Sequence, residues 1–312
     1  MPKVLLDCDP GHDDMMAMMV AIAHPGIDLV GVTTVAGNQT GDRTFANAGK
    51  VLTLLRETGI PLARGCDQPM VRPLETAPNI HGTSGLDGAD LPDSGVVART
   101  EHAVEFLEAH LVGADKPLTL VPTGPLTNIG MLLRKNPRVA EKIDRIVLMG
   151  GGVYDSNVTP AAEFNIYVDP EAADIVFNCG RPITMVSLDV TNRAMLTMDD
   201  IAAIRDMKGR VSSVVAPLLR FFAGAYEENF AVAGAPLHDA LAMMTAAEPD
   251  IITTRHLRVD VETAGIHTRG RTVVDVYGVT GRAPNAEVSF ELDLDRFKKH
   301  IFDAIREMDG RQ

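Results

Sequence analysis

Aromatic residues and cysteines are scarce in this sequence. Tryptophan is absent from the 312 residues, and aromatic residues make up 4% of the chain, so a planar ligand would have to stack on Phe, Tyr or His. The three cysteines, Cys8, Cys66 and Cys179, are scattered and odd in number. This pattern argues against a disulfide framework and favours reduced thiols in a cytoplasm.

The sequence also lacks a basic surface and a long apolar run. Lys and Arg number 29 against 42 acidic residues, which gives a net charge of −13 that repels nucleic-acid backbones and anionic membranes. No apolar run reaches the length of a membrane span. The first residues show no basic segment followed by an apolar signal region. We therefore expect a cytoplasmic protein whose partner is a small molecule, with neither nucleic acid nor membrane involved.

The apolar residues, 46% of the chain, suffice for one large core. Buried strands alternate with amphipathic helices through the first two thirds, a pattern typical of a parallel sheet with helices on both faces. Three strands in a meander, 257–262, 272–277 and 286–292, and a helix over 294–308 are predicted to follow. The expected fold is α/β: a single domain, 1–312, with a mostly parallel sheet and a small antiparallel C-terminal extension.

The most informative stretch is DCDPGHDD, with Asp7, Asp9, Asp13 and Asp14 within eight residues. It lies between a short buried strand and an apolar helix, at the edge where open α/β sheets bind ligands. Four carboxylates this close repel one another unless a cation offsets them. Oxygen ligands favour Ca²⁺ or Mg²⁺. The alternative, that acids merely favour the first turn of a helix, leaves Asp7 and Asp9 unexplained.

Further polar residues follow other predicted strands or open other helices. Asn38 comes after the second strand, and Thr123 lies between Pro122 and Gly124, where its backbone carbonyl is free to bind a hard cation. His238 and Asp239 open a helix after Pro236. The simpler explanation is a turn residue for Asn38 and a helix cap for Asp239.

Two other segments carry candidate residues in less regular sequence. His81 lies in a long Pro- and Gly-rich stretch, 67–95, which suggests a functional flap, although a lone loop histidine is more often a surface residue. Asn157, Glu163 and Asn165 follow a run of three glycines. Turn and capping chemistry explains these three equally well.

These segments together resemble the inosine-uridine nucleoside hydrolase family. The resemblance is carried, in the family's order, by DCDPGHDD, HGTSGLDG, VPTGPLTN, MGGG followed by AEFNIYVDPEAA, and APLHDALA, with VETAGIHTRGRTVVD near the end. It implies a Rossmann-like nucleoside hydrolase fold and Ca²⁺-dependent hydrolysis of the N-glycosidic bond of ribonucleosides to free base and ribose. It also implies a homo-oligomer, either a dimer or a tetramer.

The resemblance assigns roles to residues at matching positions. The general base is Asp9, which also touches the metal, and Asp7 supports it. The Ca²⁺ ligands are Asp14, Asp239 and the Thr123 carbonyl. The ribose hydroxyls are held by Asp13, Asn38, Asn157, Glu163 and Asn165. The acid that activates the leaving base is His238, and His81 lies beside the base pocket.

Two departures from the family pattern leave the substrate preference open. Ser156 stands where the family often has Gly, and Asn192 stands where a His is common. A purine-specific branch uses Trp to sandwich the base, and this chain has none. The sequence slightly favours a broad inosine-uridine preference, with a pyrimidine-preferring (uridine and cytidine) enzyme as the alternative.

Two different classes of protein are weaker alternatives. A phosphohydrolase with an aspartyl nucleophile would need basic residues for phosphate, yet none lies between Asp7 and Asp14. A non-catalytic nucleoside or sugar binder would not need Asp9, because binding requires no base.

Overall fold

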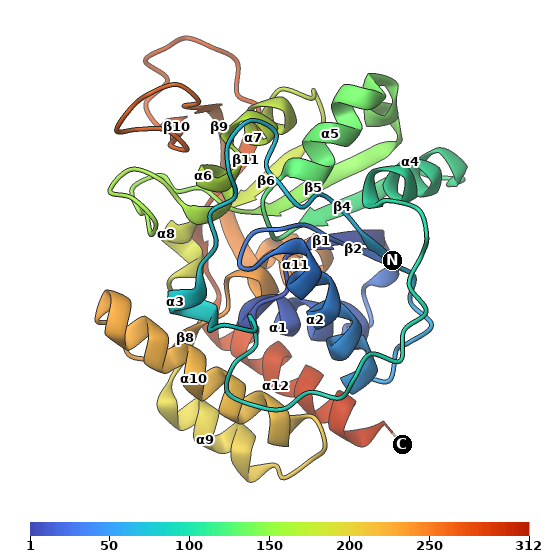
Figure 1. Ribbon diagram of the computed structural model, residues 1–312. Coiled ribbons are helices and arrows are strands. Elements are labelled where there is room, and N and C mark those ends of the chain that lie inside the picture. Colours follow the sequence, from blue (N-terminus) through green and yellow to red (C-terminus); the bar gives the residue numbers. More distant parts are fainter. Residues whose placement is uncertain (312) are drawn as a thin grey trace.

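A nine-stranded sheet organises the chain in the computed structural model, which describes residues 1–311 (Figure 1). Its strand order is β10-β9-β11-β6-β5-β4-β1-β2-β3. The strands are β1 (Lys3–Cys8), β2 (Asp28–Thr34), β3 (Leu62–Arg64), β4 (Leu118–Pro122), β5 (Ile143–Met149), β6 (Ile183–Val186), β9 (Ile252–Val261), β10 (Thr272–Asp275) and β11 (Ala286–Leu292). A separate two-stranded sheet pairs β7 (Met195–Leu196) with β8 (Ala235–Pro236).

The first six strands are all parallel, and their order reverses between β1 and β4. Strand β1 pairs with β2 on one side and with β4 on the other, and the chain runs outward from this centre in both directions. In open parallel sheets a ligand binds outside the carboxyl ends of the strands where the order reverses. The residues that follow β1 and β4 therefore mark the expected site.

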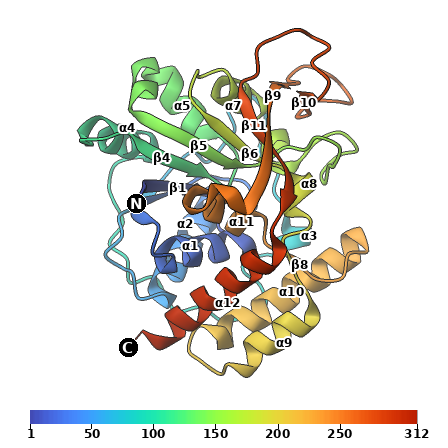
Figure 2. The same ribbon diagram turned by 180° about the vertical axis from the view of Figure 1, so that it is seen from behind.

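Helices cover both faces of the sheet, as predicted, and each face has its own apolar core. One face is covered by α4 (Ala103–Gly113), α5 (Thr127–Lys135) and α7 (Pro170–Phe177). The other is covered by α1 (His12–Ala23), α2 (Gly41–Leu54), α11 (His238–Ala247) and α12 (Leu294–Gly310), with α9 (Met198–Asp206) and α10 (Ser212–Phe230) beyond them (Figure 2). The fold is thus a single α/β domain of the expected class.

Helix α1 is buried from His12 to Ala21. An apolar helix without a polar face is stable only when neighbours cover it on all sides. Helices α11 and α12 pack against it, so α1 and α11 lie side by side beneath the sheet (Figure 1). This packing brings the N-terminal ends of α1 and α11 to the same place.

The C-terminal strands differ from the predicted meander. Strand β11 does not follow β10 in the sheet but lies between β9, to which it is antiparallel, and β6, to which it is parallel. Ala286 and Val288 are buried, because β11 extends the covered part of the sheet. The antiparallel extension is therefore β9 with β10 at the outer edge.

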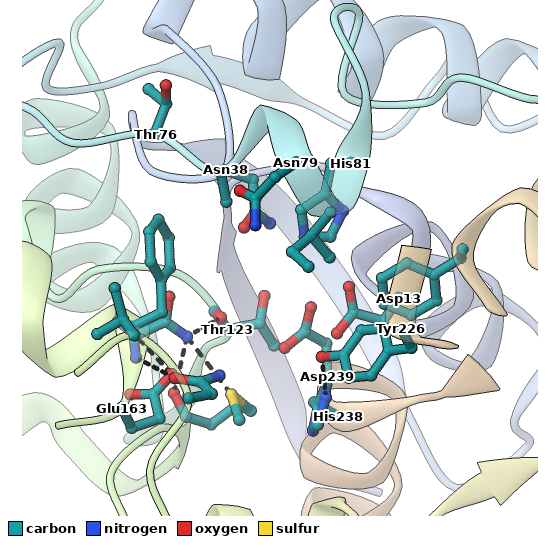
Figure 3. Close-up of a pocket in the computed structure, with 18 of the residues that line it drawn as sticks. Asp13, Asn38, Thr76, Asn79, His81, Thr123, Glu163, Tyr226, His238 and Asp239 are labelled. Carbon is teal, nitrogen blue, oxygen red and sulfur yellow. Dashed lines mark hydrogen bonds between the residues drawn. The ribbon is translucent and has the colours of Figure 1, made fainter. Parts of the chain in front are cut away.

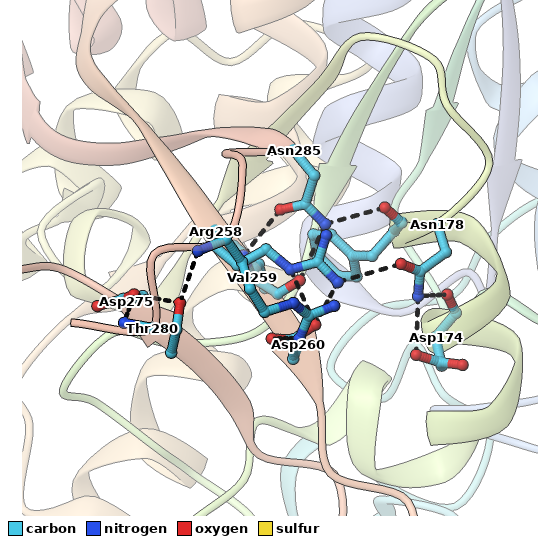
Figure 4. A network of polar contacts seen from close by, with 10 residues as sticks. Asp174, Asn178, Arg258, Val259, Asp260, Asp275, Thr280 and Asn285 are labelled. Carbon is cyan, nitrogen blue, oxygen red and sulfur yellow. Dashed lines mark hydrogen bonds and ion pairs between the residues drawn. The ribbon is translucent and has the colours of Figure 1, made fainter. Parts of the chain in front are cut away.

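A polar network joins this extension to α7 (Figure 4). Asn285 accepts a hydrogen bond from the Val259 amide at 2.7 Å and donates to the carbonyls of Val259 and Phe177 at 2.9 and 3.0 Å. Arg258 donates to Asn178 at 3.2 Å and pairs with Asp260. These contacts hold the antiparallel extension against the C-terminal end of α7.

Within residues 1–311, none of the helices has both the length and the apolar character that crossing a membrane requires.

Candidate active site

Three carboxylates meet where α1 and α11 begin. Asp13 and Asp14 lie in the first turn of α1, and Asp239 lies in the first turn of α11. Each offers an oxygen within 4.8 Å of the other two, and all three side chains are buried. Figure 3 shows Asp13 and Asp239 beside each other at the cavity. The arrangement could hold a metal ion.

The electrostatics of these acids favour a cation. Burial raises the pKa of Asp13 to about 7, with Asp14 adding to the shift, and burial followed by Asp13 raises the pKa of Asp239 well above its usual range. The ion pairs formed within residues 1–311 all use other acids. Buried charges are otherwise paired or bound to metal, so a divalent cation fits the chemistry of the donor set.

Asp9 lies just beyond β1 and carries an oxygen with no partner. Its Oδ2 accepts a hydrogen bond from the Asn38 amide at 2.7 Å, whereas its Oδ1 is buried and has no hydrogen-bond partner among residues 1–311. Burial, and then Asp14, raises the pKa of Asp9 well above its usual range. A Cβ at Gly37 or Gly124 would lie 2.2 or 2.5 Å from this carboxylate, so glycines make room for it.

Asp7 supports the turn from within the sheet. Its Oδ1 accepts hydrogen bonds from Thr33 at 2.6 Å and Asn128 at 2.7 Å, and burial raises its pKa to about 7. Its Oδ2 has no partner in the described part of the chain. Asp7 thus lies in β1, two residues before Asp9, and its hydrogen bonds support the part of the chain that carries Asp9.

Thr123 follows β4 and contacts both sides of the site. Its hydroxyl donates to Asp14 Oδ1 at 2.9 Å, and its carbonyl accepts from Asn165 Nδ2 at 2.7 Å. Asn38 also donates to Asp14, at 3.2 Å. Predicted neighbours from four separate segments are therefore connected by hydrogen bonds.

Glu163 both caps a helix and lines the candidate site. Its carboxylate caps α6 (Phe164–Val168) by accepting from the amides of Asn165 and Ile166 at 2.9 and 3.1 Å, and it accepts from Gly151 at 2.9 Å. Asn157 Oδ1 accepts from the Phe164 amide at 2.9 Å. The capping interpretation is confirmed for Glu163, yet these side chains still line the cavity.

One cavity is lined by nine of the twelve predicted residues, and Asp7, Asp9 and Asp14 are not part of its lining. One end is polar and is formed by Asp13, Asn38, Thr123, Asn157, Glu163, Asn165 and Asp239. The other is largely aromatic and holds Ile80, His81, Phe222, Tyr226, Phe230 and His238. The surface alternative for His81 is wrong, because His81 is buried at the end of α3 (Pro78–His81).

Sequence reasoning missed Tyr226 and Thr191. The Tyr226 hydroxyl lies 2.7 Å from His238 Nε2, and the Thr191 hydroxyl of α8 (Leu188–Thr191) lies 2.7 Å from His238 Nδ1. Both ring nitrogens of His238 are thus engaged, and burial lowers its pKa to about 4. Tyr226 gave no signal, because its position in α10 fits an ordinary buried helix face.

Comparisons with known proteins agree with this geometry. A family model described as inosine-uridine preferring nucleoside hydrolase matches residues 4–299. The chain is 47% identical over 295 residues to the pyrimidine-specific ribonucleoside hydrolase RihA of Shewanella woodyi, covering 94% of this chain and 95% of the relative. It is 45% identical to RihA of Escherichia coli O9:H4, covering 97% and 98%.

A solved structure extends the agreement to three dimensions. The purine-preferring ribonucleoside hydrolase from Gardnerella vaginalis superposes with a TM-score of 0.92 at 34% identity, covering 98% of this chain and 99% of that one. The chain belongs to the inosine-uridine preferring nucleoside hydrolase family, whose members cleave the N-glycosidic bond of ribonucleosides.

Proposed function

We propose that this protein is a calcium-dependent hydrolase that prefers pyrimidine ribonucleosides. The observation that carries the preference is the name of the relatives at 45 and 47% identity, pyrimidine-specific ribonucleoside hydrolase, which match over nearly their full lengths. This support favours the alternative over the broad inosine-uridine preference that the sequence ranked first. A dimer or tetramer and a cytoplasmic location stay predictions from the sequence.

The metal would be held by Asp14, Asp239 and the Thr123 carbonyl, with Asp9 adjoining. These oxygen donors suit a hard cation, and Asp14 and Asp239 are buried carboxylates whose negative charge such an ion would offset. When bound, Ca²⁺ would supply coordination for two ribose hydroxyls and a water and would lower the pKa of that water. The residues of the chain then determine how the reaction proceeds.

Asp9 is the proposed general base. The Asn38 amide holds Oδ2 at 2.7 Å, so Oδ1 is the oxygen left to take the proton as water attacks the anomeric carbon. The oxocarbenium-like transition state carries positive charge, which the acidic end of the cavity stabilises. Attack by water on the face of the ribose opposite the nucleobase predicts inversion at the anomeric carbon.

The sugar would be held at the polar end of the cavity. Glu163 is fixed by amides of α6 and Gly151, and Asn165 is fixed against the Thr123 and Met149 carbonyls at 2.7 and 3.2 Å. Rigid partners of this kind hold the ribose in one orientation, which lowers the entropic cost of reaching the transition state.

The leaving base would face the aromatic end. A consistent set of hydrogen bonds runs from Thr191 O–H to His238 Nδ1 and from His238 Nε2–H to the Tyr226 oxygen. The Tyr226 O–H is then free to donate toward the cavity. Tyr226 is therefore the proposed donor to the departing base, and His238 positions it, whereas the family resemblance assigned the donor role to His238 itself.

The direct test compares turnover of uridine, cytidine, inosine and adenosine by the purified protein with Ca²⁺ present. We expect kcat/KM for uridine and cytidine to exceed that for inosine by at least about tenfold, the scale of one lost polar contact. Comparable values for all four would restore the broad preference. Release of no free ribose from any of them would overturn the proposal.

A further inference from the structure

The segment VETAGIHTRGRTVVD, near the C-terminus, has no role in the chemistry described so far. Its Arg271 and Thr272 lie where β10 begins, in the antiparallel extension, and Thr272 is buried while Arg271 is partly buried. Within residues 1–311, Arg271 forms no ion pair. A partly buried guanidinium needs acceptors for its N–H groups, so its remaining contacts show what it holds.

Those contacts join the two ends of one loop. Arg271 Nη2 donates to the Val153 carbonyl, and its Nη1 donates to the Ala161 carbonyl at 3.2 Å. The loop between them, 153–161, contains no helix or strand, and its Asn157 and Val158 line the candidate active site. Because the donors of a guanidinium lie in a rigid plane, one side chain holds both carbonyls at a fixed separation.

The beginning of this loop is held from two further directions. The Thr272 hydroxyl donates to the Gly152 carbonyl at 2.7 Å and accepts from the Gly152 amide at 2.9 Å. Asp189 of α8 accepts from the Val153 amide at 2.6 Å. The antiparallel extension and α8 therefore fix the point where the loop leaves the sheet.

Asn157 presents its amide nitrogen to the cavity. Its Oδ1 accepts from the Phe164 amide at 2.9 Å, and a backbone N–H can only donate, so Nδ2 is the atom that can donate to a ribose oxygen. The Asn157 backbone amide donates to the Ala162 carbonyl at 3.2 Å. Ala162 adjoins the carbonyl group that Arg271 holds, so a shift at that end of the loop would move Asn157.

We propose that Arg271 and Thr272 are positioning residues for the ribose end of the site: they hold the 153–161 loop so that Asn157 Nδ2 meets a ribose oxygen. The antiparallel extension thus acts on substrate affinity, although residues 252–285, all of which the structure describes, are absent from the cavity lining. This inference rests on the proposed function, because it requires Asn157 to bind the ribose.

The kinetic test is a double-mutant cycle with uridine as substrate and Ca²⁺ present. Arg271→Met removes the guanidinium and keeps an aliphatic side chain. We expect KM to rise by up to about tenfold, the scale of one lost hydrogen bond, with kcat within about twofold, because a contact made equally in the ground and transition states affects binding alone. Asn157→Ala should raise KM by a similar factor. The double variant should match Asn157→Ala, because Arg271 acts through Asn157, and additive losses would overturn the proposal.

Conservative variants and a matched control separate positioning from general stability. Thr272→Ser keeps the hydroxyl and should retain the wild-type KM, whereas Thr272→Val has the same shape without the hydroxyl and should raise it. Arg271→Lys should recover only part of the affinity, because an ammonium lacks the planar fork. Arg255 of β9 donates to the Val276 carbonyl at 2.9 Å in the same extension, so Arg255→Met should leave KM unchanged. Equal KM values for Thr272→Ser and Thr272→Val, or an equal rise in Arg255→Met, would overturn the proposal.

Hydrogen exchange tests the loop without turnover. Peptides that span residues 153–162 should exchange up to about tenfold faster in Arg271→Met than in the wild-type protein, because the loop opens more easily without its link between the two ends. Arg255→Met should match the wild-type protein. Unchanged exchange of this loop in Arg271→Met would overturn the proposal. A wild-type protein that releases no ribose from uridine would refute the proposed function instead, and the exchange rates would still decide whether Arg271 holds the loop.

Discussion

The two ends of the α1–α11 pair differ in how they treat buried charge. At the N-terminal ends, Asp13, Asp14 and Asp239 come together, and they form no ion pair with a basic side chain within residues 1–311. At the C-terminal ends, His24 and Glu248 meet, and Glu248 also contacts His300 and Arg296. The same two helices therefore carry an unbalanced cluster at one end and a balanced one at the other.

The balanced end also holds a geometric group of possible metal ligands, His24, Glu248 and His300. The Gly26 amide, however, donates to His24 Nδ1 at 3.0 Å, so His24 Nε2 carries a proton and donates to Glu248 at 3.1 Å. A protonated nitrogen cannot bind a metal. Proximity of ligand residues is therefore insufficient evidence for a metal site, whereas acids left without a partner are informative.

The pKa values follow the same division. Burial raises the pKa of Asp239, with Asp13 and Asp14 adding to the shift. Burial also opposes ionisation of Glu248, but His300, His24 and Arg296 outweigh it and lower the pKa of that carboxyl. One end should thus be stabilised by a cation from solution, whereas at the other end Arg296 already supplies a cation.

Asp9→Ala should produce the largest change at the unbalanced end. Loss of a general base costs about 10²–10⁴-fold in rate, and loss of the oriented water adds to it. We expect uridine turnover to fall at least about 10³-fold with an unchanged circular dichroism spectrum. Glu248→Gln is the matched control and should retain near-wild-type kcat. Near-normal turnover by purified Asp9→Ala would contradict the role of Asp9.

Metal removal should reveal the repulsion among the acids. Active protein should contain about one Ca²⁺ per chain, and a chelator should abolish turnover until Ca²⁺ is restored. Elemental analysis that shows zinc, or no divalent ion in an active sample, would contradict the assignment.

The chelated protein should also depend on pH with a definite sign. Asp13 has a folded pKa of about 7, above its usual value, so its contribution to stability is complete at low pH and is lost as pH rises from about 4 through 7. The melting temperature of chelated protein should therefore be lower at pH 8 than at pH 5.5, and added Ca²⁺ should remove most of the difference. A chelated protein that is more stable at pH 8 would argue against unpaired buried acids.

Tyr226→Phe should have a smaller effect, confined to substrates that need a proton on the leaving group. We expect kcat on nucleosides to fall about 10- to 100-fold, at the low end of general acid catalysis. Hydrolysis of p-nitrophenyl riboside should change little, because p-nitrophenolate leaves without a proton. His238→Ala should show the same pattern, since it acts through Tyr226. Equal losses on both kinds of substrate would mean that Tyr226 positions the sugar.

These residues also show what the sequence could reveal. The strand-helix alternation predicted the fold, and the acidic turn indicated where the buried acids gather, because residues that follow parallel strands share one edge of the sheet. Tyr226 was missed, because a single Tyr on the buried face of an apolar helix looks like core packing. Its role depends on a distant side chain, because its hydroxyl lies 2.7 Å from His238 Nε2. The position of β11 likewise depends on long-range pairing rather than on chain order.

Glu248→Gln should have the smallest effect, and its pH dependence should be opposite in sign to that of the acids at the other end. A carboxyl whose folded pKa is lowered contributes stability above its unfolded pKa, and that contribution is lost as pH falls through the folded value. Because Glu248 is partly exposed, solvent screens the pairs, and we expect a decrease in melting temperature of only a few degrees at pH 7. The difference from wild type should shrink as pH falls through the lowered pKa of Glu248, because the wild-type carboxyl then takes up a proton. Differential scanning calorimetry of both proteins from pH 4 to 8, with Ca²⁺ present throughout, measures this convergence. A difference in melting temperature that grows toward acid pH would show that His24, His300 and Arg296 do not stabilise the ionised Glu248 carboxylate. The two helix ends would then not differ in the way described.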